Sequence, residues 1–361
     1  MDLAFAVEIG PLIVLWYVSS AIANTTSRKL LTQTPLPVLL TLLQFVAATI
    51  VGFLILHVFK FRSYAPVPKA ARKPMAKLIF VYSMGFLFVN AGYVLVNVSL
   101  AETLRATEPL ITVILAVIFL KSEPVSRMEM LCMAPIVLGG ALSSFGDSSF
   151  SALGFAFVCV SNLSFSLRSM YTKKLREVYT GDAFNVFFHV SLVGTIAFFA
   201  LLLFVELVGM GLFKSGYPGY NPQYFMKDMY IFATNVNEML LCAGINGLAY
   251  ATYNQTSFYI LSRVRMVSHG VANAFRRVVT ILFSVWYFGN HINTINGFGI
   301  ALAIIGVVLY AKAKDNKFTP PVEQADAYTE LSEEKSSVHP NPMSKIESNI
   351  GYAKTLQQNI P

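Results

Sequence analysis

The feature that most constrains this chain is a succession of long apolar runs, separated by polar or Pro/Gly-containing breaks. A helix needs about 20 predominantly apolar residues to cross the roughly 30 Å hydrocarbon core of a bilayer. The strands of a membrane β-barrel would alternate apolar and polar residues, and these runs do not alternate. The sequence therefore predicts an all-α membrane protein of about ten transmembrane helices. The predicted spans are about 7–26, 36–58, 78–98, 101–120, 128–145, 151–172, 184–209, 231–260, 267–289 and 292–313.

Composition agrees with this class, because 55% of the 361 residues are hydrophobic and only 13% are charged. The net charge of +8 is interpreted as membrane topology and attraction for anions, and not as nucleic-acid binding. The first run resembles a signal peptide, but Asp2 and Glu8 stand where such a peptide carries basic residues, so it is interpreted as a span. Three cysteines inside apolar runs are interpreted as packing residues without disulfides; they are Cys132, Cys159 and Cys242.

The distribution of polar residues predicts a tail and a topology. Residues 315–361 are polar and contain Pro and Ser, which predicts a disordered cytosolic tail behind a transporter domain over 1–314. With a cytosolic N-terminus, sixteen Lys and Arg residues flank the spans on the cytosolic side and four on the other. The positive-inside rule then places both termini in the cytosol. Because no transit peptide is visible, an endomembrane of the Golgi or ER type is expected, with the plastid envelope as the alternative.

The ten spans also suggest an internal repeat of five spans, with halves at about 7–145 and 151–313. The stretches 105–124 and 272–292 share a pattern of arginine, bulky apolar run and polar turn. An odd number of spans in each half makes the second half insert upside down relative to the first. Inverted repeats of this kind build alternating-access transporters whose site lies at the midplane between the halves.

Two adjacent arginines, Arg276 and Arg277, lie in the middle of the predicted span 267–289. Arg277 precedes the turn residue Gly289 by twelve positions, which is roughly 18 Å of helix. A charge at that depth costs on the order of 3 kcal/mol, so such residues face a bundle interior or a watery cavity and mark a substrate path. The alternative is that the pair tops a shorter helix from Val278, which would be too short to span.

Further arginines lie in the fourth span, Arg105, and in the sixth, Arg168. Glu108 follows Arg105 by three residues and is predicted to be its partner. The other acidic residues inside the spans are Glu102, Glu206 and Glu238. We expect surplus positive charge with nothing fixed to balance it, which a mobile anion would complete. Guanidinium groups offer planar, bidentate donors to phosphate oxygens, so these arginines are interpreted as a phosphate site. The alternative interpretation is that the arginines are paired in a structural network.

Polar residues in the eighth span, Tyr253, Asn254 and Gln255, offer donors and acceptors either to a ligand or to neighbouring helices. Gly139 and Gly140 are interpreted as close-packing positions. The histidines do not cluster, and the sequence has no GxxxxGK[ST] loop and no Ser/His/Asp grouping. The sequence thus predicts no enzyme, no metal site and no cofactor.

Three motifs carry a family resemblance over roughly residues 10–313. They are YNQTSFYILSRVRMVSHGVANAFRRVVTILFSVWYFGNHI (253–292), VSNLSFSLRSMYTKKL (160–175) and WYVSSAIANTTSRKLL (16–31). The chain resembles the triose-phosphate/phosphate translocators, sugar-phosphate transporters of the drug/metabolite transporter superfamily. The resemblance implies the ten-helix fold of that superfamily. It also implies exchange of a phosphorylated sugar or C3 metabolite for inorganic phosphate across the lipid bilayer.

The resemblance also implies the residues that bind phosphate. The family's Lys-Arg clamp falls on Arg276 and Arg277, its tyrosine before Asn-Gln on Tyr253, its sixth-helix arginine on Arg168 and its fourth-helix lysine on Arg105. Arginine thus replaces lysine at two of these positions, which keeps the charge but changes the donor geometry.

A second departure lies in the third helix, where the family's histidine is Tyr93. Tyr93, Asn254 and Gln255 are therefore secondary candidates for ligand contact.

A third departure is a hairpin between spans three and four that is about seven residues shorter than the family pattern, with no Gly, Pro or Asn turn between the spans. We therefore expect either that Arg105 lies near the membrane surface, or that span three breaks early and packs poorly. Two other functions stay open, a nucleotide-sugar transporter and a non-transporting membrane scaffold or receptor.

Overall fold

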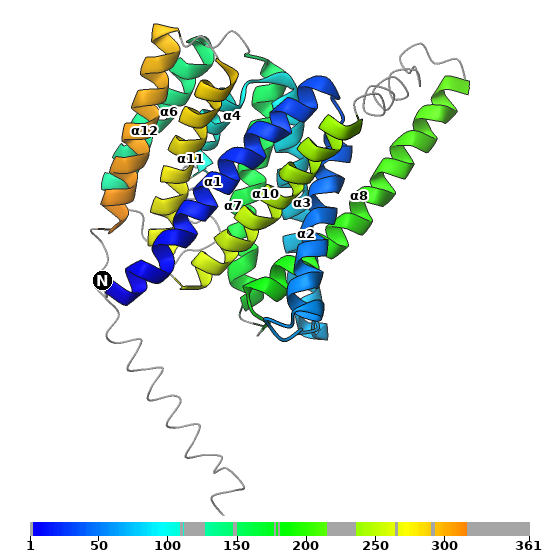
Figure 1. The fold of residues 1–361 in the computed structure, drawn as a ribbon. Coiled ribbons are helices and arrows are strands. Elements are labelled where there is room, and N and C mark those ends of the chain that lie inside the picture. The colour runs from blue at the N-terminus through cyan, green and yellow to red at the C-terminus, as the bar shows by residue number, and fades with distance from the viewer. Residues whose placement is uncertain are drawn as a thin grey trace, which may run out of the picture. The chain divides into compact units, whose positions relative to one another are not determined.

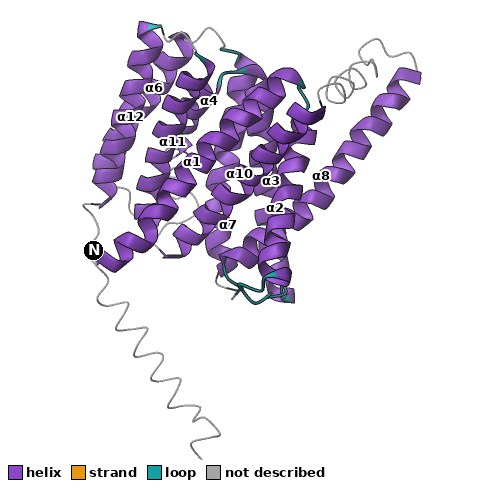
Figure 2. Ribbon diagram, in the orientation of Figure 1, coloured by secondary structure: helices purple, strands orange, loops and turns teal. Residues whose placement is uncertain are grey.

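The computed structural model describes residues 3–108, 111, 127–146, 150–176, 178–179, 181–214, 236–263, 266–289 and 293–315, all within the compact unit Met1–Asp315. Figure 2 shows that this part of the chain consists of helices joined by loops. The α-helices are α1 (Leu3–Gln33), α2 (Pro37–Phe53), α3 (Arg72–Leu95), α4 (Val98–Arg105), α6 (Arg127–Gly146), α7 (Ala152–Arg176), α8 (Ala183–Lys214), α10 (Val236–Arg263), α11 (Met266–Phe288) and α12 (Thr294–Asp315). The predicted tail, 315–361, lies outside the described residues from position 316 onward.

The all-helical class predicted from the apolar runs is confirmed for the described residues. Among them, five helical segments are long and apolar enough to cross a membrane: Ile9–Gln33, Pro37–Val58, Lys69–Leu95, Ala152–Arg176 and Ala183–Val205. Local sequence explains some of the boundaries. Pro37 occupies the first turn of α2, where its missing N–H costs nothing. The full set of ten spans and their inverted repeat stays a prediction.

The helices pack in pairs that are distant in sequence (Figure 1). Helix α1 lies along α10, α3 lies against α7, and α6 lies against α12. The close approach of α6 and α12 depends on Gly139, where an added Cβ would come within 2.4 Å of the backbone nitrogen of Ala303. The interpretation of Gly139 as a close-packing position is thereby confirmed.

Buried polar side chains join α1, α2, α3 and α10. Asn90 Nδ2 donates to Gln44 Oε1 at 2.9 Å and to Thr41 Oγ1 at 2.9 Å. Gln44 Nε2 donates in turn to Asn246 Oδ1 at 3.0 Å, and Asn246 Nδ2 donates to Ser27 Oγ at 2.9 Å. In a hydrocarbon environment polar groups have to be satisfied inside the protein, and hydrogen bonds of this kind hold neighbouring helices together.

The connection between α3 and α4 differs from its expected form. The predicted span 78–98 ends as a helix at Leu95, and Val96 is extended, with φ −136° and ψ 156°. Asn97 has the extended backbone of an N-cap, with φ −65° and ψ 151°. The span therefore does break early, and Asn97 is the turn residue that the sequence reading overlooked because it lay inside the predicted span.

The expected poor packing at this break is wrong. Val96, Val98, Leu100 and Ala101 are all fully buried. The reason is that α4 is enclosed, since it contacts α11, α7 and α6. The break therefore turns the chain into the interior of the bundle and carries Arg105 with it.

Candidate functional site

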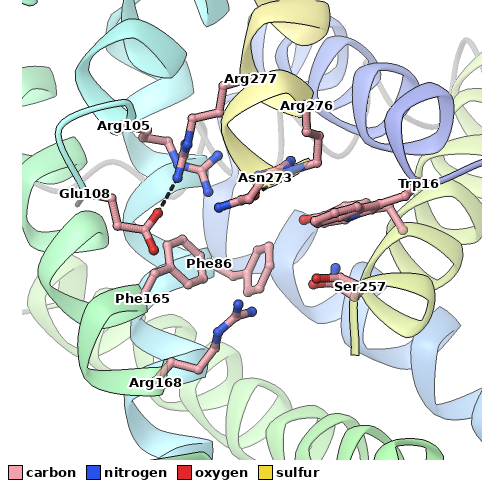
Figure 3. Close-up of a pocket in the computed structure, with 12 residues that line it drawn as sticks. Trp16, Phe86, Arg105, Glu108, Phe165, Arg168, Ser257, Asn273, Arg276 and Arg277 are labelled. Carbon is pink, nitrogen blue, oxygen red and sulfur yellow. Dashed lines mark hydrogen bonds and ion pairs between the residues drawn. The ribbon is translucent and has the colours of Figure 1, made fainter. Parts of the chain in front are cut away.

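A cavity among the helices gathers most of the candidate residues (Figure 3). Its empty volume is about 360 Å³, counting the open space at its mouth. The arginines come from three helices, with Arg105 on α4, Arg168 on α7 and the pair Arg276 and Arg277 on α11. The other lining residues are Trp16, Phe86, Glu108, Phe165, Tyr253, Asn254, Ser257 and Asn273.

The two adjacent arginines of α11 are buried, at 5% and 4% exposure, but they have different partners. Arg276 Nε donates to Asn273 Oδ1 at 2.9 Å, and its Nη1 donates to Ser20 Oγ. Its guanidinium carbon also lies 5.8 Å from the ring centroid of Trp16 and 5.8 Å from that of Tyr253. These partners are neutral, so they orient Arg276 without cancelling its charge.

Arg277, in contrast, is ion-paired with two carboxylates. Its Nη2 contacts Glu108 Oε2, as the dashed line in Figure 3 marks, and its Nη1 lies 3.4 Å from Glu102 Oε2. Glu108 was predicted to be the partner of Arg105; the ion pair found for it is with Arg277. A helical turn places residues three apart on one face, but it does not decide which neighbouring helix competes for the carboxylate.

Glu102 is the counter-charge that the sequence reading did not assign. It is fully buried, at 0% exposure, and its Oε1 accepts from Arg105 Nη1 at 2.5 Å and from Tyr93 Oη at 2.8 Å. The expectation of surplus charge with nothing fixed to balance it is therefore only half right. Two carboxylates, Glu102 and Glu108, offset two of the four arginines.

Arg168 faces the other arginines from the opposite side of the cavity (Figure 3). Its guanidinium carbon lies 5.5 to 5.6 Å from the ring centroids of Tyr82, Phe165 and Phe258. Within the described part of the chain its guanidinium group has no ion pair and no hydrogen bond. Aromatic faces attract a cation but leave its N–H donors unused, so Arg168 presents free donors at the cavity wall.

Of the three secondary candidates for ligand contact, Asn254 lines the cavity, and Gln255 and Tyr93 are not among the described residues that line it. Asn254 lines the cavity, although its Nδ2 donates to Tyr250 O of its own helix at 3.0 Å. Gln255 is buried outside the lining formed by the described residues. Tyr93 is also buried outside it and reaches the site only through Glu102.

Six wall residues were not predicted as site residues: Trp16, Phe86, Glu108, Phe165, Ser257 and Asn273. Trp16, Phe86, Phe165 and Ser257 line the cavity, yet each stands in an apolar helix where aromatic and small residues are common. Of these four, a local signal exists only for Trp16, one of two tryptophans in the chain, since a tryptophan well inside a span lies away from the interfaces where it is enriched.

Comparison with known proteins identifies relatives along most of the chain. A phosphoenolpyruvate/phosphate translocator 3 of Oryza sativa subsp. japonica is 31% identical over 324 residues, covering 87% of this chain and 77% of the relative. A triose phosphate/phosphate translocator of non-green plastids of Brassica oleracea var. botrytis is 31% identical over 315 residues, covering 87% and 74%. A solved crystal structure resembles the fold with a TM-score of 0.50 at 17% identity, over 88% of this chain and 100% of that one.

These relatives overturn the expected location. Both are named as chloroplastic proteins, so the expectation of a Golgi or ER membrane is wrong and the relatives point to the plastid. That expectation rested on not recognising a transit peptide, and such an absence does not decide where a protein is located. The resemblance noted from the motifs is confirmed by a match to the family model over residues 7–311. The chain belongs to the Triose-phosphate Transporter family.

Proposed function

We propose that this protein is a secondary transporter that exchanges a phosphorylated C3 metabolite or sugar phosphate for inorganic phosphate. One observation carries the proposal: four arginines from three helices converge on a cavity, and two of them, Arg168 and Arg276, have no carboxylate partner among the described residues. A phosphate group carries close to two negative charges and accepts several charge-assisted hydrogen bonds. Such an anion matches the uncompensated charge of the cavity.

The roles of the residues follow from their partners. Arg276, oriented by neutral groups, and Arg168, held over aromatic rings, approach the phosphate oxygens from opposite walls. Arg105 and Arg277 supply further donors while remaining paired to carboxylates. Tyr253 and Asn254 border the space where the rest of the substrate would lie. Tyr93 acts indirectly, through Glu102.

The names of the relatives support this class of substrate. They are phosphate translocators of phosphoenolpyruvate and of triose phosphates, and none of these names refers to a nucleotide sugar. A non-transporting scaffold would have no use for buried cations that lack a counter-charge, because each costs free energy when no ligand is bound. A receptor is disfavoured because the relatives are named as translocators. Both alternatives are therefore weaker than the antiporter.

We further propose that the transporter domain, 1–314, consists of two inverted halves of five helices, about 7–145 and 151–313. The helix packing supports this division, because the pattern of helix contacts stays the same when each helix is replaced by its counterpart in the other half. The contact of α1 with α10 corresponds to that of α7 with α3. The contacts α2–α8, α4–α11 and α6–α12 each join a helix to its own counterpart. Such a pseudo-twofold arrangement permits rocking about a central site, which is the geometry of alternating access.

The exchange is tested with purified protein in liposomes. Uptake of labelled phosphate is measured into liposomes loaded with phosphate and into liposomes loaded with an impermeant salt. We expect rapid uptake only with internal phosphate. Without it the carrier would have to reorient empty, with uncompensated arginines in a low-dielectric environment, and this is energetically unfavourable. Equal uptake into both sets of liposomes would contradict the antiporter, and no uptake into either would contradict phosphate transport.

A further inference from the structure

The buried carboxylate Glu102 has a feature that phosphate binding alone does not require. Among the described residues, its two oxygens face only donors: Arg105 Nη1, Tyr93 Oη, Arg277 Nη1 at 3.4 Å and Asn24 Nδ2 at 3.4 Å. An ionised carboxylate accepts all four, whereas a protonated one would have to donate. The surroundings therefore keep Glu102 negatively charged, although it is fully buried.

Glu102 acts on the cavity through charge and not through contact. It is not among the residues that line the cavity, but it is ion-paired with Arg105 and Arg277, which are. Taken together, the described residues that line the cavity or pair with its arginines supply four guanidinium groups and two carboxylates, Glu102 and Glu108. The surplus is therefore two positive charges, and without Glu102 it would be three.

This surplus discriminates between two classes of phosphorylated metabolite. A phosphate monoester without other charged groups carries up to two negative charges near neutral pH. A phosphorylated carboxylic acid such as phosphoenolpyruvate carries one more, since its carboxyl group is ionised. In the low-dielectric interior the additional charge has no fixed partner among the described residues and meets the buried carboxylates instead.

We propose that Glu102 is a specificity-determining residue that restricts this transporter to uncarboxylated phosphate monoesters of the triose phosphate class. The proposal rests on the proposed function, since it assumes that the cavity binds phosphate. It separates this chain from relatives named for phosphoenolpyruvate, although they are as similar in sequence as those named for triose phosphate.

The test measures the ratio of two exchange activities in liposomes loaded with phosphate. External dihydroxyacetone phosphate and external phosphoenolpyruvate are compared by kcat/KM for the unaltered protein and for Glu102→Gln, which keeps the shape of the side chain and removes its charge. We expect the unaltered protein to favour dihydroxyacetone phosphate. In Glu102→Gln the ratio should shift about tenfold toward phosphoenolpyruvate. This is the size of effect expected from removing one negative charge close to the lining of the cavity.

A matched control and a variant of opposite sign complete the experiment. Glu238→Gln makes the same change at an exposed carboxylate that pairs with Lys29 at 2.9 Å, and it should leave the ratio unchanged. Asn273→Asp adds a negative charge beside Arg276 on the cavity wall and should shift the ratio further toward dihydroxyacetone phosphate. This second variant keeps the proposal testable if Glu102→Gln does not fold.

The outcomes distinguish the two levels of the proposal. If the unaltered protein exchanges phosphate but prefers phosphoenolpyruvate, the role of Glu102 is wrong while the antiporter stands. If Glu102→Gln or Asn273→Asp lowers both activities equally and leaves the ratio constant, the charge of the site does not select the substrate. If the unaltered protein exchanges neither substrate nor phosphate, the proposed function itself fails.

Discussion

Arg277 Nη1 lies 3.4 Å from Glu102 Oε2, although the two residues stand 175 positions apart in the chain. The contact joins α11 to the short helix α4 inside the bundle. Arg276, the residue before Arg277, instead contacts the neutral side chains of Asn273 and Ser20. Two arginines that look equivalent in the sequence thus differ in their surroundings: Arg277 is paired with carboxylates, whereas the charge of Arg276 is uncompensated.

Replacing Arg276 should affect transport more than stability. Arg276→Ala removes an uncompensated charge that is free to meet the anion, so we expect phosphate exchange in liposomes to fall by about 10- to 100-fold, as for loss of a hydrogen bond to a charged group. Arg276→Lys restores the charge without the guanidinium fork and should retain more exchange than Arg276→Ala. Equal activity of Arg276→Ala and the unaltered protein would remove Arg276 from the site.

Replacing Arg277 should also destabilise the fold. Arg277→Ala leaves Glu102 and Glu108 with fewer cationic partners in the interior, and breaking a buried ion pair typically costs about 3–5 kcal/mol. We therefore expect a lower thermal midpoint in detergent for Arg277→Ala than for Arg276→Ala. The double variant Arg277→Ala with Glu108→Gln should recover part of this loss, because it removes one stranded charge. No recovery would mean that the Glu108 contact does not stabilise the fold.

Arg168 offers the cleanest separation of function from folding, because it has no ion pair within the described part of the chain. Arg168→Ala should lower phosphate exchange by at least about tenfold, while the thermal midpoint changes little beyond the loss of its aromatic contacts. Arg176→Ala is the matched control, since Arg176 is exposed on the same helix. Comparable losses of exchange in the two variants would show that Arg168 has no special role.

The contact between α6 and α12 should tolerate no side chain at Gly139. Gly139→Ala would place a Cβ within 2.4 Å of Ala303 N and within 2.6 Å of Gly299 O, and we expect it to destabilise the protein by about 1–3 kcal/mol. Gly140→Ala is the control, because the nearest atom of the described residues to its Cβ would be Thr107 Cγ2 at 3.6 Å, an ordinary contact. Thermal unfolding in detergent measures both; equal midpoints would contradict the tight packing.

The candidate site was only partly accessible to sequence reasoning. All five residues expected to bind phosphate lie at one cavity; they are Arg105, Arg168, Tyr253, Arg276 and Arg277. The four arginines could be found because a charged residue in an apolar helix has few structural explanations. The charge balance could not be found, because Arg277, which pairs with both Glu102 and Glu108, lies 175 and 169 positions away from them in the chain.

By itself the sequence determined the helical class and the presence of cations in the interior. Both depend on local properties: a span needs a run of apolar residues, and a charge inside that run is unfavourable unless it faces the interior of the bundle. Only the tertiary structure decided that Asn97 ends span three early, that α4 carries Arg105 inward, and that Glu102 lies behind the cavity wall. These features depend on which helices touch, and that is settled by packing between residues from different parts of the chain, as in the contacts of α4 with α6, α7 and α11, where a local pattern holds no information.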